Sequence, residues 1–224
     1  FHTEPGGSIS GTVTDAQGNP IETLRVNAHC YDQNGNWLFG TASYTASDGT
    51  YIIKGLAEGT YRILADGEEL DYIKEYYPDT TNWYGAELVW IDPTLNEQPT
   101  GINFSLERAG WISGTVTNAS GQAVSDLWLY VYDDPCWDNY LKGTKTNASG
   151  RYNVGGLPPG DVYIRACAGC DHLPYENIWW NSSNGTGDSS CSMADPVQIR
   201  SGNETSEVNF QMRKGQRRIR WFEV

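Results

Sequence analysis

The chain lacks any apolar run long enough to cross a bilayer. Within its 224 residues no uninterrupted apolar stretch approaches the roughly 18 residues that a membrane-spanning helix needs. It also lacks the 3.6-residue apolar periodicity of an amphipathic helix, apart from one short candidate turn near residues 72–77. The sequence therefore predicts a protein without a membrane span and with almost no helix.

Histidine is scarce, and no catalytic motif surrounds the three histidines that are present. His2, His29 and His172 lack a nearby Ser or Cys nucleophile and a metal-ligand partner at i+2 or i+4. No glycine-rich phosphate loop opens a helix. Paired carboxylates such as Glu68-Glu69 fall in turns, where a solvated pair is the common outcome. These absences predict that the protein is not an enzyme.

Basic residues are also few. The chain has 15 Lys and Arg against 28 Asp and Glu, a net charge of −13. Because phosphate binding needs a basic face, nucleic acid is excluded as a partner. Calcium is the one metal that such an acidic chain brings into question. Asp32-x-Asn34-x-Asn36 resembles the start of an oxygen-ligand loop, and Asp133, Asp134 and Asp138 form a similar cluster.

The first of these clusters lacks the later bidentate Glu of a calcium loop, and Asn34-Gly35 is a strong hairpin signal. A turn is therefore the preferred interpretation. We predict no cofactor, with bound Ca²⁺ as the alternative left open.

The main positive feature is an internal repeat. The sequence Ile-Ser-Gly-Thr-Val-Thr at 9–14 returns 103 residues later, at 112–117. Three further landmarks return in the same order: 48–51 at 149–152, 55–59 at 156–160 and 102–104 at 208–210. Two copies of one domain follow, over residues 1–109 and 110–215, with 216–224 left outside the repeat.

Each copy contains seven short segments of strand composition, separated by turn residues. They are 8–14, 24–31, 37–44, 51–54, 60–65, 86–91 and 101–106, and then 111–117, 126–132, 140–146, 151–154, 161–167, 195–199 and 206–212. This spacing predicts an all-β chain of two tandem seven-stranded antiparallel Greek-key sandwiches, followed by one extra C-terminal strand.

The repeated motifs resemble those of the carboxypeptidase regulatory-like domain, a transthyretin-like sandwich. They read Ile-Ser-Gly-Thr-Val-Thr, Asp-Gly-Thr-Tyr, Gly-Leu-x-x-Gly-Thr-Tyr and Ile-Asn-Phe-x-Leu, and the resemblance covers nearly all of 8–212 in two copies. It implies an accessory or stalk module of a secreted or surface protein. Related adhesin repeats carry a Lys–Asn isopeptide cross-link, but neither first strand here contains a Lys.

Cysteine usage indicates an oxidising compartment. Strand alternation places Cys30 on the core face, as a buried free thiol. We expect Cys136, Cys167, Cys170 and Cys191 to form disulfides, with Cys136–Cys167 and Cys170–Cys191 preferred among three connectivities. The alternative is a zinc site that uses Cys167-x-x-Cys170, although the other two cysteines are isolated.

Six Asn-x-Ser/Thr sequons support an extracellular or cell-surface location, although a chain rich in Asn, Ser and Thr also produces sequons by chance. The candidate glycosylation sites are Asn103, Asn118, Asn147, Asn181, Asn184 and Asn203.

Paired aromatic residues precede the sixth predicted strand of each copy. They are Trp83 with Tyr84 in the first copy and Trp179 with Trp180 in the second. Exposed rings of this kind stack on sugars, so polysaccharide is a candidate ligand. The alternative is that one ring of each pair caps the open end of its sandwich.

The C-terminal segment has the composition of a single additional strand. Its candidate interface residues are Arg217, Arg218, Ile219, Arg220, Trp221, Phe222 and Val224. A lone apolar strand needs a partner. We therefore expect it to add to the sheet of another copy and build a homopolymeric fibre. The alternatives are that it packs on its own sandwich, that the chain is a fragment, or that the protein is a carbohydrate-binding or stalk module of a larger adhesin or enzyme.

Overall fold

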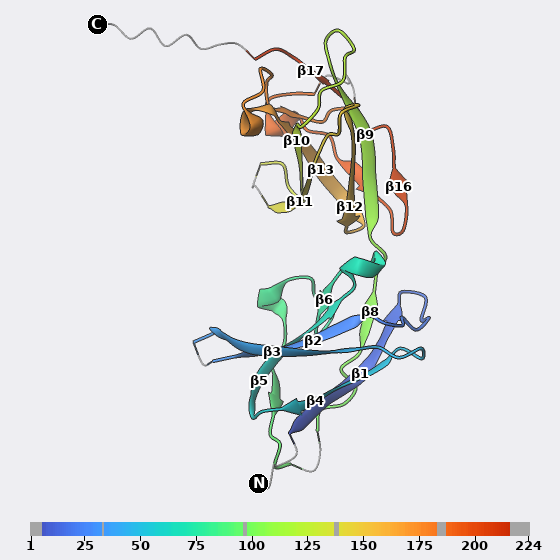
Figure 1. Cartoon of the computed structure of the whole chain (residues 1–224), viewed down its shortest axis with the longest axis vertical. Helices are drawn as coiled ribbons and strands as arrows, with labels where there is room; N and C mark the ends of the chain where they lie inside the picture. Colours follow the sequence, from blue (N-terminus) through green and yellow to red (C-terminus); the bar gives the residue numbers. More distant parts are fainter. Residues whose placement is uncertain (1–5, 33, 96–97, 137–138, 183–186, 216–224) are drawn as a thin grey trace, which may run out of the picture. The chain divides into compact units, whose positions relative to one another are not determined.

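The computed structural model describes residues 6–32, 34–95, 98–136, 139–182 and 187–215. The chain divides into two compact units, Phe1–Arg108 and Ala109–Val224, both drawn in Figure 1. Strands make up 50% of the structure and helix 6%, which confirms the predicted all-β class. In the described residues the helix consists of 3₁₀ turns, at Glu68–Leu70, Trp83–Gly85, Ala168–Asp171 and Cys191–Met193.

The first unit packs two sheets against each other. One sheet has the strand order β4-β1-β8, and the other has the order β3-β2-β5-β6, with β7 also paired to β5. The strands are β1 (Gly7–Asp15), β2 (Arg25–Tyr31), β3 (Trp37–Tyr44), β4 (Thr50–Leu56), β5 (Gly59–Asp66), β6 (Glu75–Tyr76), β7 (Val89–Ile91) and β8 (Phe104–Leu106).

The second unit repeats this arrangement. The order β12-β9-β16, with β17 also on β9, faces the order β11-β10-β13-β14, with β15 also on β13. The strands are β9 (Gly110–Asn118), β10 (Trp128–Tyr132), β11 (Tyr140–Lys145), β12 (Arg151–Leu157), β13 (Gly160–Cys167), β14 (Ile178–Trp179), β15 (Val197–Ile199), β16 (Glu204–Thr205) and β17 (Phe210–Met212).

Three details differ from the prediction. Two-residue strands β6, β14 and β16 join the seven expected segments. The helical turn expected near 72–77 is wrong, because Glu75–Tyr76 pairs with β5 as a strand; six residues are too few for periodicity to separate helix from strand. The wholly antiparallel arrangement is also wrong. The chain crosses from β7 to the other sheet and enters β8 parallel to β1, as β16 and β17 enter parallel to β9.

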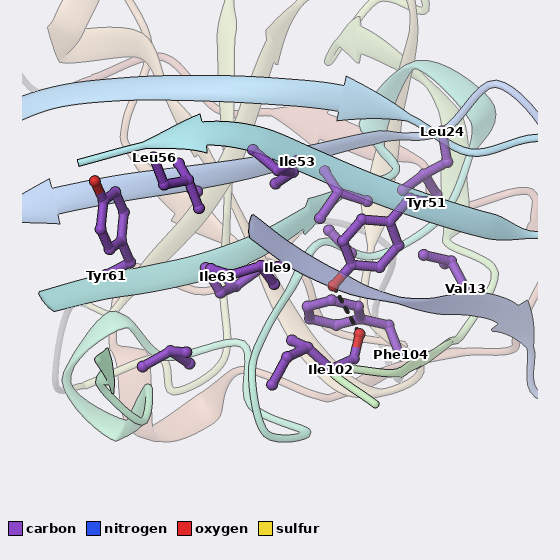
Figure 2. Packing of buried hydrophobic residues seen from close by; sticks show 14 of the residues in the cluster. Ile9, Val13, Leu24, Tyr51, Ile53, Leu56, Tyr61, Ile63, Ile102 and Phe104 are labelled. Atoms are coloured by element: carbon purple, nitrogen blue, oxygen red, sulfur yellow. Dashed lines mark hydrogen bonds between the residues drawn. The ribbon is translucent and has the colours of Figure 1, made fainter. Parts of the chain in front are cut away.

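Alternation along the strands builds a separate core in each unit. In β5 the side chains of Tyr61, Ile63 and Ala65 point inward and are fully buried. The inward residues of β1 and β4 meet them from the opposite sheet, as Figure 2 shows for Ile9 and Ile53. The core of the second unit is built by the corresponding strands, and among the described residues it ends at Met212.

One backbone contact explains the repeated motifs. The Cα of Gly11 lies so close to the next segment that a Cβ there would be 1.9 Å from the Ile102 carbonyl oxygen. The Tyr51 hydroxyl donates a 2.7 Å hydrogen bond to the same oxygen (Figure 2). In the second unit Gly114 approaches the Val208 carbonyl in the same way, and the Tyr152 hydroxyl donates to it. The glycine and tyrosine landmarks of the repeat therefore hold the last segment of each sandwich against its first strand.

Candidate functional site

The predicted C-terminal interface strand lies outside the described residues. This applies to Arg217, Arg218, Ile219, Arg220, Trp221, Phe222 and Val224. The described chain continues past β17 to Lys214, which forms a bridge with Tyr175, and ends at Gly215. The counterpart of such a strand is a sheet edge that a sandwich leaves open.

The strand β3 presents the most apolar of these edges. In the described part of the chain β3 pairs with β2 alone, so its second edge has no strand partner. Its side chains are unusually exposed for their type: 62% of Trp37, 50% of Leu38, 41% of Phe39 and 64% of Tyr44. We call these four residues and the free side of β3 the β3 edge. An exposed apolar edge strand is a template for pairing with another strand.

A bulge in the β2–β3 hairpin explains why the side chains at the start of β3 are exposed. Tyr31 pairs with Trp37 and Cys30 with Phe39, so that Leu38 is the extra residue of a bulge. Three consecutive apolar residues cannot alternate, and some of them must face solvent. Together β2 and β3 form the long hairpin of the first unit in Figure 1.

The hairpin turn uses the residues considered for calcium. The Asp32 carboxylate accepts hydrogen bonds from the Asn36 side chain and from the backbone N–H groups of Asn34 and Asn36. These bonds, that of the Asn36 side chain first, lower the pKa of Asp32. In the second unit Asp133 accepts from the Asn139 side chain and Asp134 from the Cys136 backbone, while residue 138 lies outside the described residues. Across the described ranges no three His, Cys, Asp or Glu side chains are grouped to hold a metal.

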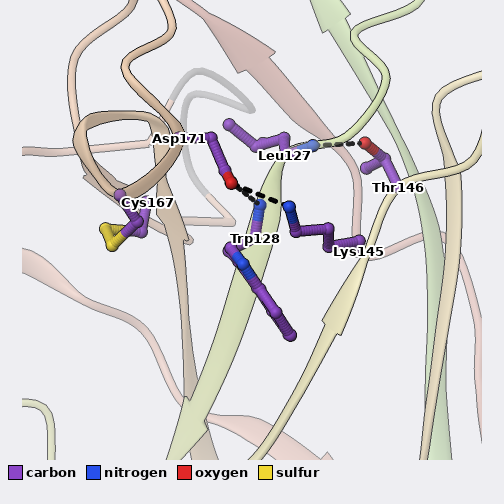
Figure 3. A network of polar contacts seen from close by, with 7 residues as sticks. Leu127, Trp128, Lys145, Thr146, Cys167 and Asp171 are labelled. Atoms are coloured by element: carbon purple, nitrogen blue, oxygen red, sulfur yellow. Dashed lines mark hydrogen bonds and ion pairs between the residues drawn. A yellow bond between two sulfur atoms is a disulfide. The ribbon is translucent and has the colours of Figure 1, made fainter.

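The corresponding edge of the second unit is charged. Strand β11 carries Lys142 and Lys145 where β3 has no charged residue. The Lys145 ammonium lies 2.7 Å from Asp171 Oδ1 and 5.2 Å from the centre of the Trp128 ring (Figure 3). Asp171 in turn accepts a hydrogen bond from the Trp128 backbone. Lysines on an edge strand discourage further strand pairing.

The aromatic pair of the first unit is divided between two environments. Trp83 is half-buried, edge-to-face with Tyr31 at 4.5 Å and Tyr76 at 5.7 Å. The Arg62 guanidinium covers its ring, with Cζ 4.4 Å from the ring centre. Tyr84 is 90% exposed. Trp83 therefore packs on the outer face of the sheet, and only Tyr84 offers a free ring.

The structure places Trp179 poorly for glycan stacking. Its side chain is 5% exposed, because β14 pairs with β13 and brings the ring against Tyr132 at 5.2 Å and under Arg165 at 5.6 Å. Trp180 packs against the core of the second unit. The capping alternative describes this pair better than a sugar-binding platform.

Sequence reasoning missed an aromatic row on the outer face of the second unit. The Trp128 and Tyr130 rings stack with centres 5.4 Å apart and planes at 8°, and Tyr140 meets Tyr130 edge-to-face at 5.9 Å. The alternation Trp128-x-Tyr130-x-Tyr132 was the available signal, since period two places all three on one face. These rings pack against one another on the outer face of the sheet.

All four cysteines of the second unit form disulfides, but the preferred pairing was wrong. Cys136 bonds to Cys191 and Cys167 to Cys170. The reason is local: β13 ends at Cys167, and the 3₁₀ turn Ala168–Asp171 folds Cys170 back to a Cα–Cα distance of 5.4 Å. The zinc alternative is also wrong, because each of the four sulfur atoms is bonded to another sulfur and none is left as a thiolate ligand. Cys30 is a buried free thiol, as predicted.

The predicted glycosylation sites differ in accessibility. Asn103, Asn147 and Asn203 are exposed, whereas Asn118 is half-buried and its Nδ2 donates to the Gln122 side chain. Asn181 is 7% exposed and its Nδ2 donates to the Met193 carbonyl, an arrangement that disfavours a glycan on this atom. Asn184 lies outside the described residues. Glycosylation of the exposed sequons remains a prediction.

The half-buried carboxylate of Glu75 makes the stability of the first unit depend on pH. Glu75 has an Oε1 atom that is buried without a hydrogen-bond partner. Burial first, and then the charge of Asp79, raises the pKa of Glu75 from its ordinary value of 4.5 to about 7. The folded state therefore holds a proton that the unfolded state has lost between these two pH values. Stability falls as pH rises from 4.5 to 7 and is recovered below 4.5.

We expect Glu75→Gln to raise the free energy of unfolding of the first unit by about 1–2 kcal/mol at pH 8, after allowance for solvent screening, and to change it little at pH 4. Urea unfolding at the two pH values measures this difference. The same change at exposed Glu69 is the control and should have no pH-dependent effect. An equal gain from Glu75→Gln at both pH values would show that the ionised carboxylate is not the cause.

The described residues contain no helix with the length and apolar character needed to traverse a bilayer. A search of curated proteins found no match to the chain. Three similar solved structures are pilins. A minor pilin of Streptococcus agalactiae is 11% identical, over 93% of this chain and 96% of its own, at a TM-score of 0.41. A streptococcal ancillary pilin is 12% identical, over 97% and 64%, at 0.40. The shaft pilin of Lactobacillus rhamnosus GG is 9% identical, over 94% and 98%, at 0.32. At such scores we infer nothing about function from them.

The sequence model of the carboxypeptidase regulatory-like domain matches residues 8–72. This range runs from β1 to the end of the first 3₁₀ turn and includes the glycine and tyrosine landmarks of the first unit. The second unit repeats the same landmarks and the same strand order. The resemblance predicted from the motifs is thereby confirmed for residues 8–72, which match the model of the carboxypeptidase regulatory-like domain.

Proposed function

We propose that this protein is a non-enzymatic extracellular structural protein whose copies join head to tail into a filament. In this proposal residues 217–224 of one copy pair as a strand with a sheet edge of the next copy. Such a contact uses different surfaces on the two partners and does not close on itself, so it continues into a fibre.

The observation that carries the proposal is the open edge on the first sandwich. Strand β3 is eight residues long, has no strand partner on one side within the described chain, and exposes four large apolar side chains. Monomeric proteins usually protect such an edge with charge, proline or a covering segment. Here it is left uncovered by the described residues, as expected of a surface that is buried by assembly.

Charge favours the same contact. Residues 213–224 carry five basic and one acidic side chain, a net charge of +4, and residues 1–212 carry 10 basic and 27 acidic, a net charge of −17; the two sum to −13. A basic apolar segment is attracted to the acidic body of another copy. Disulfides support an oxidising extracellular compartment.

The test is removal of residues 216–224. Among the described residues both hydrophobic cores end by Met212, so the shortened chain keeps all of these core residues. We expect full-length protein to form filaments in negative-stain electron microscopy and the deletion variant to stay monomeric, with unchanged circular dichroism. Filaments from the deletion variant would show that residues 217–224 are not the joining strand. A full-length protein that remains monomeric at high concentration would favour the stalk-module alternative.

A further inference from the structure

The β3 edge of the first unit combines exposed apolar side chains with the absence of charged residues on the strand, which suits an apolar, arginine-rich strand as its partner. We infer that it is the acceptor for residues 217–224 of a second copy, so that assembly joins the C-terminal end of one chain to the first unit of the next. This inference rests on the proposed function and specifies which sheet edge of the next copy accepts the strand.

Length and backbone chemistry suit this pairing. The segment 217–224 and β3 both contain eight residues. Each residue of an extended strand advances about 3.3 Å, so the two can pair along their whole length. Every second backbone N–H and C=O of β3 points away from β2 and toward the incoming strand. The hydrogen bonds of strand addition need only this free backbone, and they are independent of side-chain identity.

Apolar contact adds to the backbone bonds. Trp37, Leu38 and Phe39 lie together at the start of β3 and are each at least 41% exposed. The incoming segment carries Ile219, Trp221, Phe222 and Val224. Alternation along a strand divides the incoming side chains between its two faces, and the bulge at Leu38 gives β3 apolar side chains on both of its faces. Pairing therefore buries large apolar groups on each side of the extended sheet.

Charge distinguishes β3 from the equivalent edge of the second unit. Residues 31–53, from the end of β2 to β4, contain Asp32 and Asp48 and no basic residue. A segment with three arginines at 217, 218 and 220 meets no repulsion there. Strand β11 instead carries Lys142 and Lys145, the second of them paired with Asp171, and of its large apolar side chains only Tyr140 is exposed. The acceptor thus lies in the first unit.

Strand β4, an edge strand of the opposite sheet, is a poorer acceptor than β3. Strand β4 directs Tyr51, Ile53 and Leu56 into the core, and of its large apolar residues Ile52 is the exposed one, at 45%. It also carries Lys54. An added strand would find less apolar surface there and one like charge.

Lysine substitutions on the β3 edge test the inference in the full-length chain. Leu38→Lys and Trp37→Lys keep exposed positions exposed, remove an apolar contact and place a positive charge against the arginines. We expect either to raise the concentration needed for filament assembly at least tenfold, as measured by sedimentation. Leu88→Lys, at a 51% exposed position just before β7, and Tyr140→Lys, at a 55% exposed position of β11, are charge-matched controls. They should change that concentration less than twofold.

Amide hydrogen exchange distinguishes burial of the β3 edge in the filament from a general change in stability, because only β3 should be protected. Amides of β3 should exchange at least tenfold more slowly in filaments of the full-length protein than in the chain lacking 216–224, and amides of β11 should be unchanged. Protection at β11 or β4 without protection at β3 would overturn the inference. So would normal assembly of both β3 variants.

The two proposals fail in different ways. If deleting 216–224 abolishes assembly while Leu38→Lys and Trp37→Lys assemble normally, the C-terminal strand has another acceptor and the proposed function stands. If filaments form without 216–224, both proposals are wrong.

Discussion

Replacing Cys136 and Cys191 together by alanine is expected to lower the free energy of unfolding of the second unit by about 4 kcal/mol. The disulfide joins residues 55 apart in sequence, and it restricts the unfolded chain over that whole loop. Loop-closure entropy grows with the logarithm of loop length, which gives this value for a loop of that size. The first unit contains neither cysteine and should keep its stability.

The second disulfide provides a matched control within the same unit. Cys167 and Cys170 are only 3 apart in sequence, so the same relation predicts a loss of about 2 kcal/mol for the pair of alanine substitutions. Urea unfolding of each variant, followed by hydrogen exchange in both units, separates the two effects. Equal losses from the two pairs, or a loss confined to the first unit, would contradict the loop-length explanation.

The disulfide connectivity could not be predicted from the sequence. Four cysteines have three pairings, and the choice depends on where the loops lead. Cys136 follows β10 and Cys191 opens a 3₁₀ turn that no pattern predicted. Their Cα atoms are 5.3 Å apart only because the loop between β14 and β15 returns to the end of the sheet formed by β10 and β11. The preference for Cys136–Cys167 relied on order along the chain, which does not measure distance.

The strands that the sequence did predict share a local cause. Strand β3 was expected at 37–44 and is found at Trp37–Tyr44, because Asn34-Gly35 sets where the hairpin turns. Strands β1 and β9 were placed within one or two residues of their observed ends by alternation and the following turn. The two-residue strands β6, β14 and β16 were missed, since so short a segment carries no period and forms only where a neighbouring strand passes.

In the candidate site, too, the features set by local sequence were predictable and those set by long-range pairing were not. The apolar run Trp37-Leu38-Phe39 is plain in the sequence, and so is the arginine-rich segment after 215. Which strand lies at an edge, however, depends on the order of strands in the sheet. Order β3-β2-β5 follows from long-range pairing. The burial of Trp179 was missed for the same reason, because its cover comes from Tyr132 and Arg165 on other strands.

The glycine landmark of the first unit allows the most severe prediction. We expect Gly11→Ala to destabilise the first unit by about 4 kcal/mol or more, which for a domain of ordinary stability leaves it largely unfolded. The added Cβ would lie 1.9 Å from the oxygen and 2.5 Å from the carbon of the Ile102 carbonyl, both of them backbone atoms. A flexible side chain could move aside, whereas this carbonyl is fixed.

Three hydrogen bonds fix that segment. The Tyr51 hydroxyl donates to the Ile102 oxygen, and burial raises the pKa of Tyr51 so that the hydroxyl keeps its proton at ordinary pH. The Ile102 N–H donates to the Ser10 carbonyl, and the Thr12 N–H donates to the Asn103 side chain. Moving Ile102 away from a methyl group at position 11 breaks this arrangement and opens the core between β1 and β8. Tyr51→Phe removes one bond only and should cost about 1–3 kcal/mol.

The second unit offers the control. Gly114→Ala should unfold that unit alone, because its Cβ would lie 2.1 Å from the Val208 oxygen. Gly155→Ala in β12 changes the same residue type in the same unit, but its Cβ would meet nothing closer than 3.8 Å and its backbone is not left-handed. We expect it to alter stability by less than about 1 kcal/mol. Calorimetry of the three variants gives the comparison. If Gly11→Ala and Gly114→Ala melt like Gly155→Ala, close backbone approach is not what these glycines provide, and the landmarks of the repeat need another explanation.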